Sequence, residues 1–101
     1  MSASPGLEAF IDESIRVSQE HGYNPTAFVG MRHRHGTVDA ISRLVTSGDL
    51  QTGFKRMRAL GLLKWTLEGA VMQFPDEFPR PVREAAEWRL AQARGRKRNP
   101  D

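Results

Sequence analysis

Residues that stop and start helices recur at short intervals along this chain, and they limit it to a string of brief helices. The stretch GYNPTAF is the clearest case. Gly22 suits the left-handed conformation that ends a helix, Asn24 suits the N-cap of the next helix, and Pro25 suits its first turn. Tyr23, which precedes the cap, is placed to pack against Phe28 as a hydrophobic staple. Each residue thus has a local backbone role, which favours a helix–helix corner over a ligand-binding loop.

Similar signals divide the rest of the chain. Ser4, Thr37 and Thr66 are candidate N-caps, and Gly36 and Gly61 are candidate helix ends. Between these signals apolar residues recur at steps of three and four residues, as they do on one face of a helix. The predicted helices span residues 5–21, 25–35, 38–45, 54–60, 67–74 and 81–94.

Two segments do not follow the helical pattern. Residues 46–53, TSGDLQTG, have the composition of a loop, and residues 74–81, FPDEFPRP, contain three prolines that favour an irregular backbone. The run Leu62, Leu63 and Trp65 suits a short strand. Sustained two-residue alternation is missing, so the predicted fold class is all-α, a compact bundle of five or six short helices.

The composition is that of an ordinary globular domain, with 39% hydrophobic and 27% charged residues in 101. We expect a single helical domain over residues 1–95 and a basic flexible tail over residues 96–101. The predicted core consists of Phe10, Ile11, Ile15, Phe28, Met31, Ile41, Leu44, Phe54, Met57, Leu60, Val71 and Leu90.

Several classes of protein are excluded or disfavoured. Cysteine is absent, which excludes disulfides and thiolate chemistry. No apolar run reaches the roughly 18 residues of a membrane span, and the first residues lack the basic-then-apolar order of a signal peptide. We therefore expect a cytoplasmic location and no contact with a membrane.

A longer pattern extends from the GYNPT corner. It consists of Gly22-Tyr23-Asn24-Pro25-Thr26, Phe28, Met31, His35-Gly36, Ala40, Leu44, Gly53-Phe54, Leu60 to Leu62 and Thr66-Leu67-Glu68. In these residues the chain resembles a small helical module of bacterial proteins, which sometimes lies at the C-terminal end of larger chains and whose function is not established. The resemblance covers roughly residues 7–93. It implies a compact helical unit with an accessory role, and it supplies no catalytic residue. The basic stretches FKRMR and RGRKR depart from the pattern.

Catalytic and metal-binding patterns are weak. On a helix, His33 and His35 point about 200° apart, so they do not chelate a metal from one face, and Gly36 interrupts the helix before Asp39. Adjacent carboxylates such as Asp76 and its neighbour in a proline-rich loop are usually solvated rather than placed across a substrate. No phosphate-binding loop or nucleophile elbow is present. We expect no enzyme activity, no metal and no cofactor.

Positive charge is concentrated in the second half of the chain. Residues 1–50 carry four basic and six acidic side chains, and residues 51–101 carry eleven and six, so the halves have net charges of −2 and +5. A basic helix face and the basic tail could contact phosphates, with Trp65 and Trp88 as stacking platforms. The alternative is an ordinary solvated surface. The candidate nucleic-acid-binding residues are Lys55, Arg56, Arg58, Lys64, Arg94, Arg96, Lys97 and Arg98.

Two main functional hypotheses follow from the sequence, and a third is an enzyme subunit or small-molecule binder. The first is a non-enzymatic interaction module that binds a protein partner. The alternative is a nucleic-acid-binding accessory domain that uses the basic residues above. The sequence leaves the partner and the oligomeric state open.

Overall fold

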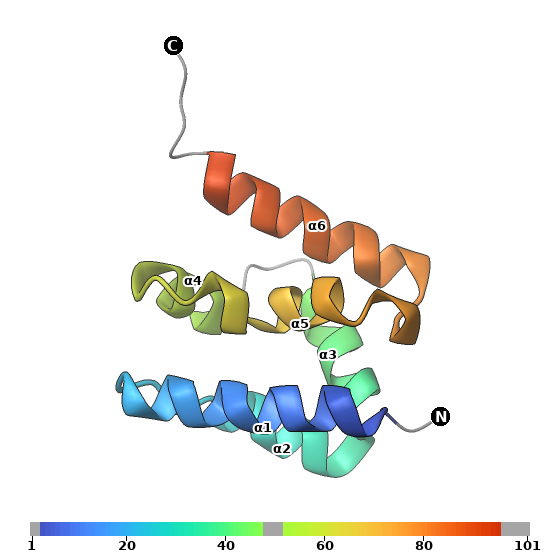
Figure 1. The fold of residues 1–101 in the computed structure, drawn as a ribbon, viewed down its shortest axis with the longest axis horizontal. Helices are drawn as coiled ribbons and strands as arrows, with labels where there is room; N and C mark the ends of the chain where they lie inside the picture. Colours follow the sequence, from blue (N-terminus) through green and yellow to red (C-terminus); the bar gives the residue numbers. More distant parts are fainter. Residues whose placement is uncertain (1–2, 48–51, 96–101) are drawn as a thin grey trace.

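Short helices make up nearly the whole fold. A computed structural model describes residues 3–47 and 52–95. The α-helices are α1 (Pro5–Glu20), α2 (Thr26–His35), α3 (Thr37–Val45), α4 (Thr52–Ala59), α5 (Leu67–Gln73) and α6 (Arg80–Gly95), and the 3-10 helices are η1 (Leu63–Trp65) and η2 (Pro75–Glu77) (Figure 1). These described residues contain no strand, which confirms the prediction of an all-α bundle of five or six short helices.

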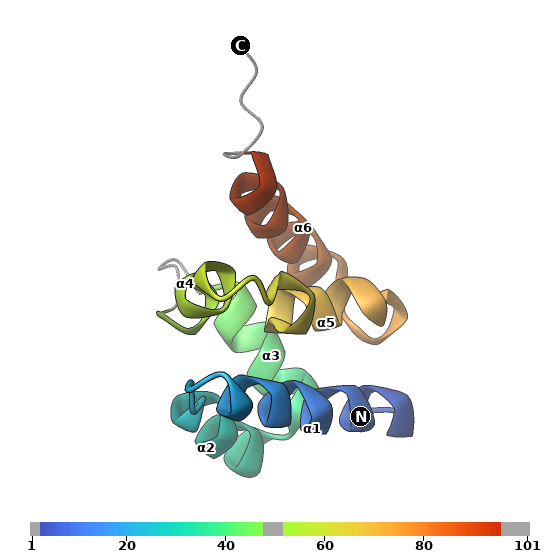
Figure 2. The same ribbon diagram turned by 60° about the vertical axis from the view of Figure 1, so that its left-hand side comes forward.

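The helices lie in three tiers, which both ribbon views separate (Figures 1 and 2). α1 and α2 form the lower tier, α4 and α5 form the middle tier, and α6 crosses above them. α3 rises from the lower tier to the middle tier and packs against α2, α5 and α6. This arrangement leaves the end of α1 facing α4 and η1.

Most of the predicted helix ends are confirmed. Ser4 caps α1 by accepting a hydrogen bond from the Leu7 amide, and the Thr66 side chain caps α5 in the same way. The three glycines predicted to end helices, Gly22, Gly36 and Gly61, have φ values of 87°, 90° and 76°. Residues with a Cβ rarely adopt this left-handed region, so these positions favour glycine.

The predicted N-cap at Asn24 is wrong by one residue. The carbonyl of Pro25 accepts the first helical hydrogen bond, from Val29, so Pro25 is the N-cap of α2 and makes no side-chain cap. The Asn24 carbonyl accepts instead from the Thr26 amide at 2.8 Å, and its side-chain oxygen accepts from Gln19. Asn24 therefore stabilises the turn between α1 and α2 and lies one residue before the N-cap of α2.

Three further boundaries differ from the sequence predictions. The segment predicted as a short strand contains the 3-10 helix η1 (Leu63–Trp65), with Leu62 as its N-cap. α4 begins at Thr52, inside the predicted loop, and α6 begins one residue before Pro81 because proline is tolerated in a first helical turn. The predicted irregular segment 74–81 contains η2, and it buries Phe78, which has only 3% of its surface exposed.

Thr37 is the first residue of α3 and makes no side-chain cap, in contrast to its predicted role. Its hydroxyl donates to Glu8 at 2.7 Å and accepts from Arg32 Nε at 2.9 Å. Arg32 also bonds Glu8 and Asp12, so this N-terminal network joins the beginning of α1 to α2 and α3. The hydrogen bonds from Arg32 and Thr37 hold the pKa of Glu8 below its usual value.

The apolar core contains all the residues predicted for it as buried or half-buried side chains. The main cluster lies between α1, α3, α5 and α6, and a smaller one joins α4 to the end of α6. The fully buried members of the prediction are Ile11, Phe28, Ile41, Phe54, Met57, Val71 and Leu90. The half-buried members are Phe10, Ile15, Met31, Leu44 and Leu60.

Within residues 3–47 and 52–95, no helix is long and apolar enough to cross a membrane. The predicted tail, with Arg96, Lys97 and Arg98, lies outside the described residues.

Candidate functional site

The inward face of α1 changes character along its length. Leu7 and Ile11 are completely buried in the main core, but the next inward positions are occupied by Ser14 and Ser18. A serine fills much less space than a leucine or isoleucine, so the end of α1 touches η1 and α4 through its hydroxyls but leaves volume beside them unfilled.

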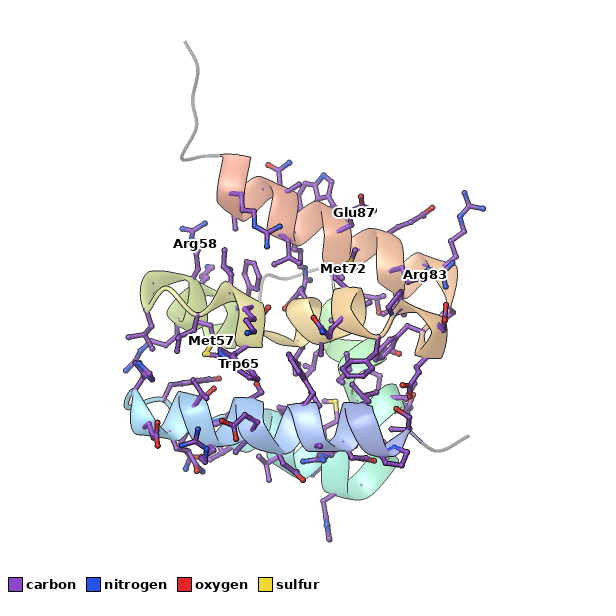
Figure 3. All side chains as sticks on the ribbon, viewed as in Figure 1. Met57, Arg58, Trp65, Met72, Arg83 and Glu87 are labelled. Carbon is purple, nitrogen blue, oxygen red and sulfur yellow. The ribbon has the colours of Figure 1, made fainter. Side chains whose placement is uncertain are left out.

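A cavity of about 240 Å³ occupies this space. It lies between α1, the GYNPTAF corner, α4 and the segment from η1 to α5. In Figure 3 the side chains of Met57 and Trp65 point from α4 and η1 toward α1. The wall is mainly apolar and aromatic, with Ile15, Tyr23, Phe28, Phe54, Met57 and Trp65 among its residues. We call this space the α1 cavity.

The serine and threonine hydroxyls in the wall are bonded to the protein itself. Ser14 Oγ donates to the Trp65 carbonyl at 2.5 Å, and Ser18 Oγ donates to the Ser14 carbonyl at 2.8 Å. Thr66 Oγ1 donates to the Leu63 carbonyl at 2.7 Å. None of these hydroxyls is paired with a basic side chain, as an activated nucleophile would be.

Trp65 is fixed against α1 by its ring as well as by its carbonyl. Its ring stacks on Phe10, with ring centroids 4.9 Å apart and an interplanar angle of 24°. This contact and the hydrogen bond from Ser14 hold one wall of the α1 cavity in place. Trp88, the other candidate stacking platform, lies on α6 and is 63% exposed.

Glu68 lines the α1 cavity and belongs to a buried ion pair. Glu68, in the first turn of α5, accepts from Arg89 of α6 at 2.9 Å, and the two side chains are only 4% and 7% exposed. Arg89 also donates to the carbonyls of Leu44 and Ser47 at the end of α3. The guanidinium therefore ties three helices together, at a helix C-terminus where positive charge is favourable.

Burial raises the pKa of Glu68, and the charge of Arg89 opposes this rise. A carboxyl with a raised pKa in a cleft is a common sign of a catalytic acid or base. Here the Glu68 carboxylate is paired with Arg89 instead. Tyr23 is the other ionisable residue among those that line the cavity.

Two of the candidate nucleic-acid-binding residues lie over aromatic rings. Arg56 lies over the ring of Tyr23, with its guanidinium carbon 5.9 Å from the ring centroid. Lys64 lies over the ring of Trp65, with its ammonium nitrogen 5.0 Å from the centroid. Both rings line the α1 cavity, so these two rim cations, Arg56 and Lys64, stand beside its walls.

The other candidates lie elsewhere. Arg58 points away from α1, toward α6 (Figure 3). Arg94 is exposed near the end of α6, which packs against α4, and Lys55 is exposed on α4. Arg96, Lys97 and Arg98 fall outside the described residues.

The histidines and the acidic pair have other surroundings. His35 Nδ1 lies 4.0 Å from Asp39, and His33 is exposed. Among the residues that the structure describes, no group of three or more metal-ligating side chains is present. Glu77 accepts hydrogen bonds from the amide and hydroxyl of Ser4, so it anchors the N-terminus of α1 instead of being simply solvated, whereas Asp76 is exposed.

Sequence reasoning identified the corner residues but missed the α1 cavity and the Glu68–Arg89 pair. Of the structural motif, Tyr23, Pro25 and Phe28 line the cavity, while Gly22 and Asn24 shape the turn. The available signal was the appearance of Ser14 and Ser18 on the apolar stripe of α1. No comparable signal links Glu68 to Arg89.

Comparison of the chain with protein-family models, curated proteins and solved structures gave no match.

Proposed function

We propose that this protein is a non-enzymatic interaction module that holds a protein partner through the α1 cavity. The observation that carries the proposal is the cavity itself, a mainly apolar and aromatic space of about 240 Å³ beside the main core cluster. Binding energy at protein interfaces is concentrated in a few apolar or aromatic anchors that fill such pockets.

The size of the cavity favours an anchoring side chain over a cofactor. Pockets for small molecules usually measure about 300–1,000 Å³, whereas a cavity of about 150 Å³ accommodates benzene. The α1 cavity therefore suits one aromatic side chain or two small aliphatic ones. Its serine and threonine hydroxyls and its carboxylate already have partners within the protein, which also favours binding over catalysis.

Filling the mouth of the cavity tests this proposal. Ala27 lines the cavity from α2 and is exposed, so Ala27→Phe should occupy the space without disturbing buried neighbours. Ala9→Phe is the matched control, because Ala9 is an exposed helical alanine of α1 outside the cavity. Wild type and both variants are immobilised and exposed to nuclease-treated extract of the source cell. A partner that wild type and Ala9→Phe retain and Ala27→Phe loses supports the proposal. Equal retention by Ala27→Phe contradicts it.

Nucleic-acid binding is a second candidate, favoured by the unpaired basic residues. Among the described residues, Lys55, Arg56, Arg58, Lys64 and Arg94 form no ion pair. Titration of labelled DNA and RNA at two salt concentrations tests this function, since phosphate contacts weaken steeply with salt. Binding that falls with salt and is reduced by Lys55→Glu with Arg58→Glu would support it. No binding at low salt would remove it.

A further inference from the structure

The rim cations give the α1 cavity a charge that its walls do not neutralise. The positive ends of Arg56 and Lys64 lie 5.9 and 5.0 Å from the centroids of two rings that line the cavity. The carboxylate of Glu68 in the same wall is buried and bonded to Arg89. The cavity therefore combines a mainly apolar wall with positive charge beside two of its aromatic rings.

The rim cations differ from the other unpaired basic residues by their position over rings that line the α1 cavity. In the lower tier, Arg16 bonds Glu13 and Glu20, and Arg32 bonds two carboxylates of α1. Neither rim cation has a carboxylate partner among the residues that the structure describes. Instead each lies over an aromatic ring, a position that keeps the side chain near the cavity and leaves its charge open to a partner.

We infer that the partner segment is acidic, with carboxylates beside an apolar anchor. This inference rests on the function proposed above and specifies the chemistry of the partner. The anchor enters the α1 cavity, and the flanking Asp or Glu side chains meet Arg56 and Lys64. Complementary charges at the edge of an interface speed association and select among partners that share the same anchor.

An acidic protein segment fits the geometry better than a nucleic acid. Phosphate binding along a strand requires cations that follow one face, but Arg58 points away from α1 (Figure 3), whereas the rim cations lie over rings of the α1 cavity. An apolar cavity beside the cations also has no role in sequence-independent phosphate contact. A segment that alternates apolar and acidic side chains uses both features.

Selection from a random displayed-peptide library tests the inference. The library is selected on wild type and depleted on Ala27→Phe, so that only sequences that need an open cavity remain. We expect those sequences to share an aromatic or aliphatic anchor flanked by Asp and Glu. If their anchors are flanked by neutral or basic residues, the inference is wrong and the proposed function stands. If no sequence prefers wild type over Ala27→Phe, both fail.

The selected peptide is then compared with its Asp→Asn and Glu→Gln counterpart by fluorescence anisotropy. At about 50 mM salt the acidic peptide should bind roughly tenfold more tightly, and the difference should shrink at about 300 mM because exposed charges are screened. Arg56→Gln with Lys64→Gln should remove the preference. Arg58→Gln with Arg94→Gln, which changes the net charge equally but away from the cavity, should retain it.

Two outcomes overturn the inference that Arg56 and Lys64 bind acidic side chains of the partner. One is an equal loss of preference in both double variants, which would mean that only net charge matters. The other is an oligonucleotide whose binding is abolished by the Arg56 and Lys64 substitutions and unaffected by Ala27→Phe. In that case the rim cations contact phosphates.

Discussion

Replacing Arg89 with methionine should strongly destabilise the fold. Methionine retains much of the apolar stem but removes the hydrogen bonds to Glu68 and to the carbonyls of Leu44 and Ser47. Hydrogen bonds to charged groups contribute about 1.5–3 kcal/mol each. The sum over the lost bonds is the upper limit for the loss in free energy of unfolding. Removing one member of a buried ion pair costs about 3–5 kcal/mol. We expect a loss in that range, a large share of the roughly 5–15 kcal/mol that stabilises a domain of this kind.

Urea unfolding followed by circular dichroism measures this loss, and Arg80→Met provides the matched control. Arg80 lies on the same helix and pairs with Glu84 at 2.9 Å, but the two side chains are 78% and 62% exposed. Such an exposed pair contributes only about 0.3–0.5 kcal/mol. If Arg89→Met is no more destabilising than Arg80→Met, the buried pair does not hold the three helices together.

Two extensions isolate the charge of Glu68. In Arg89→Met with Glu68→Leu, no charge remains buried, so part of the lost stability should return. In Arg89→Met alone, burial acts on Glu68 without an opposing charge, so the folded-state pKa lies above that of the unfolded chain. The protonated carboxyl then favours the folded state below the unfolded pKa, and this benefit is lost as the pH rises through the folded pKa. The deficit relative to wild type should therefore be smaller at about pH 5 than at neutral pH, and an unchanged deficit would contradict this reasoning.

Three further predictions concern local packing and pKa. A Cβ at Gly69 would lie 2.4 Å from a backbone carbonyl oxygen of η1, so Gly69→Ala should cost about 1–3 kcal/mol in urea unfolding. Gly30→Ala, in the middle of α2, meets only the end of a flexible side chain and should stabilise by about 0.5–1 kcal/mol, and equal effects would contradict the close contact at Gly69. The pKa of Glu8 should lie below its usual value and rise in Arg32→Gln, as measured by carboxyl NMR titration. The stabilising contribution of Glu8 is present above the unfolded pKa and is lost as the pH falls through the lower folded pKa. An unshifted titration of Glu8 would contradict its contact with Arg32. Glu77→Ala removes the acceptor of two hydrogen bonds from the N-terminus of α1 and should cost about 1 kcal/mol in the same urea assay, and unchanged stability would contradict this role.

The helix ends could be predicted because their causes are local. The cap at Ser4 and the left-handed glycine at Gly36 each depend on a few neighbouring residues. Asn24 was misplaced by one position because the same residue is suited to an N-cap and to the turn before one. The apolar stripes were read correctly for the same reason, since a helix repeats its inward face every three or four residues.

The contacts between helices could not be predicted in this way. Glu68 in a first helical turn usually suggests an exposed side chain stabilised by the helix dipole, whereas here α6 covers it. Its partner, Arg89, lies 21 residues away, and the pair forms only because α6 crosses α5 at that point. The α1 cavity depends likewise on how α4 and η1 approach α1, although the serines of α1 gave a local indication.

Those serines bear on whether the α1 cavity is a binding site or a packing imperfection. Larger apolar residues at positions 14 and 18 would fill the space and add stability, because unfilled volume costs roughly 24 cal/mol per Å³ in engineered cavities. A site kept open for a partner gives up this stability, and filling it should improve the isolated protein while harming its function. Ala27→Phe should therefore be at least as stable as wild type in urea and still lose the partner. If it loses the partner and is also less stable, position 27 supports the fold, and the loss of binding would no longer point to the cavity.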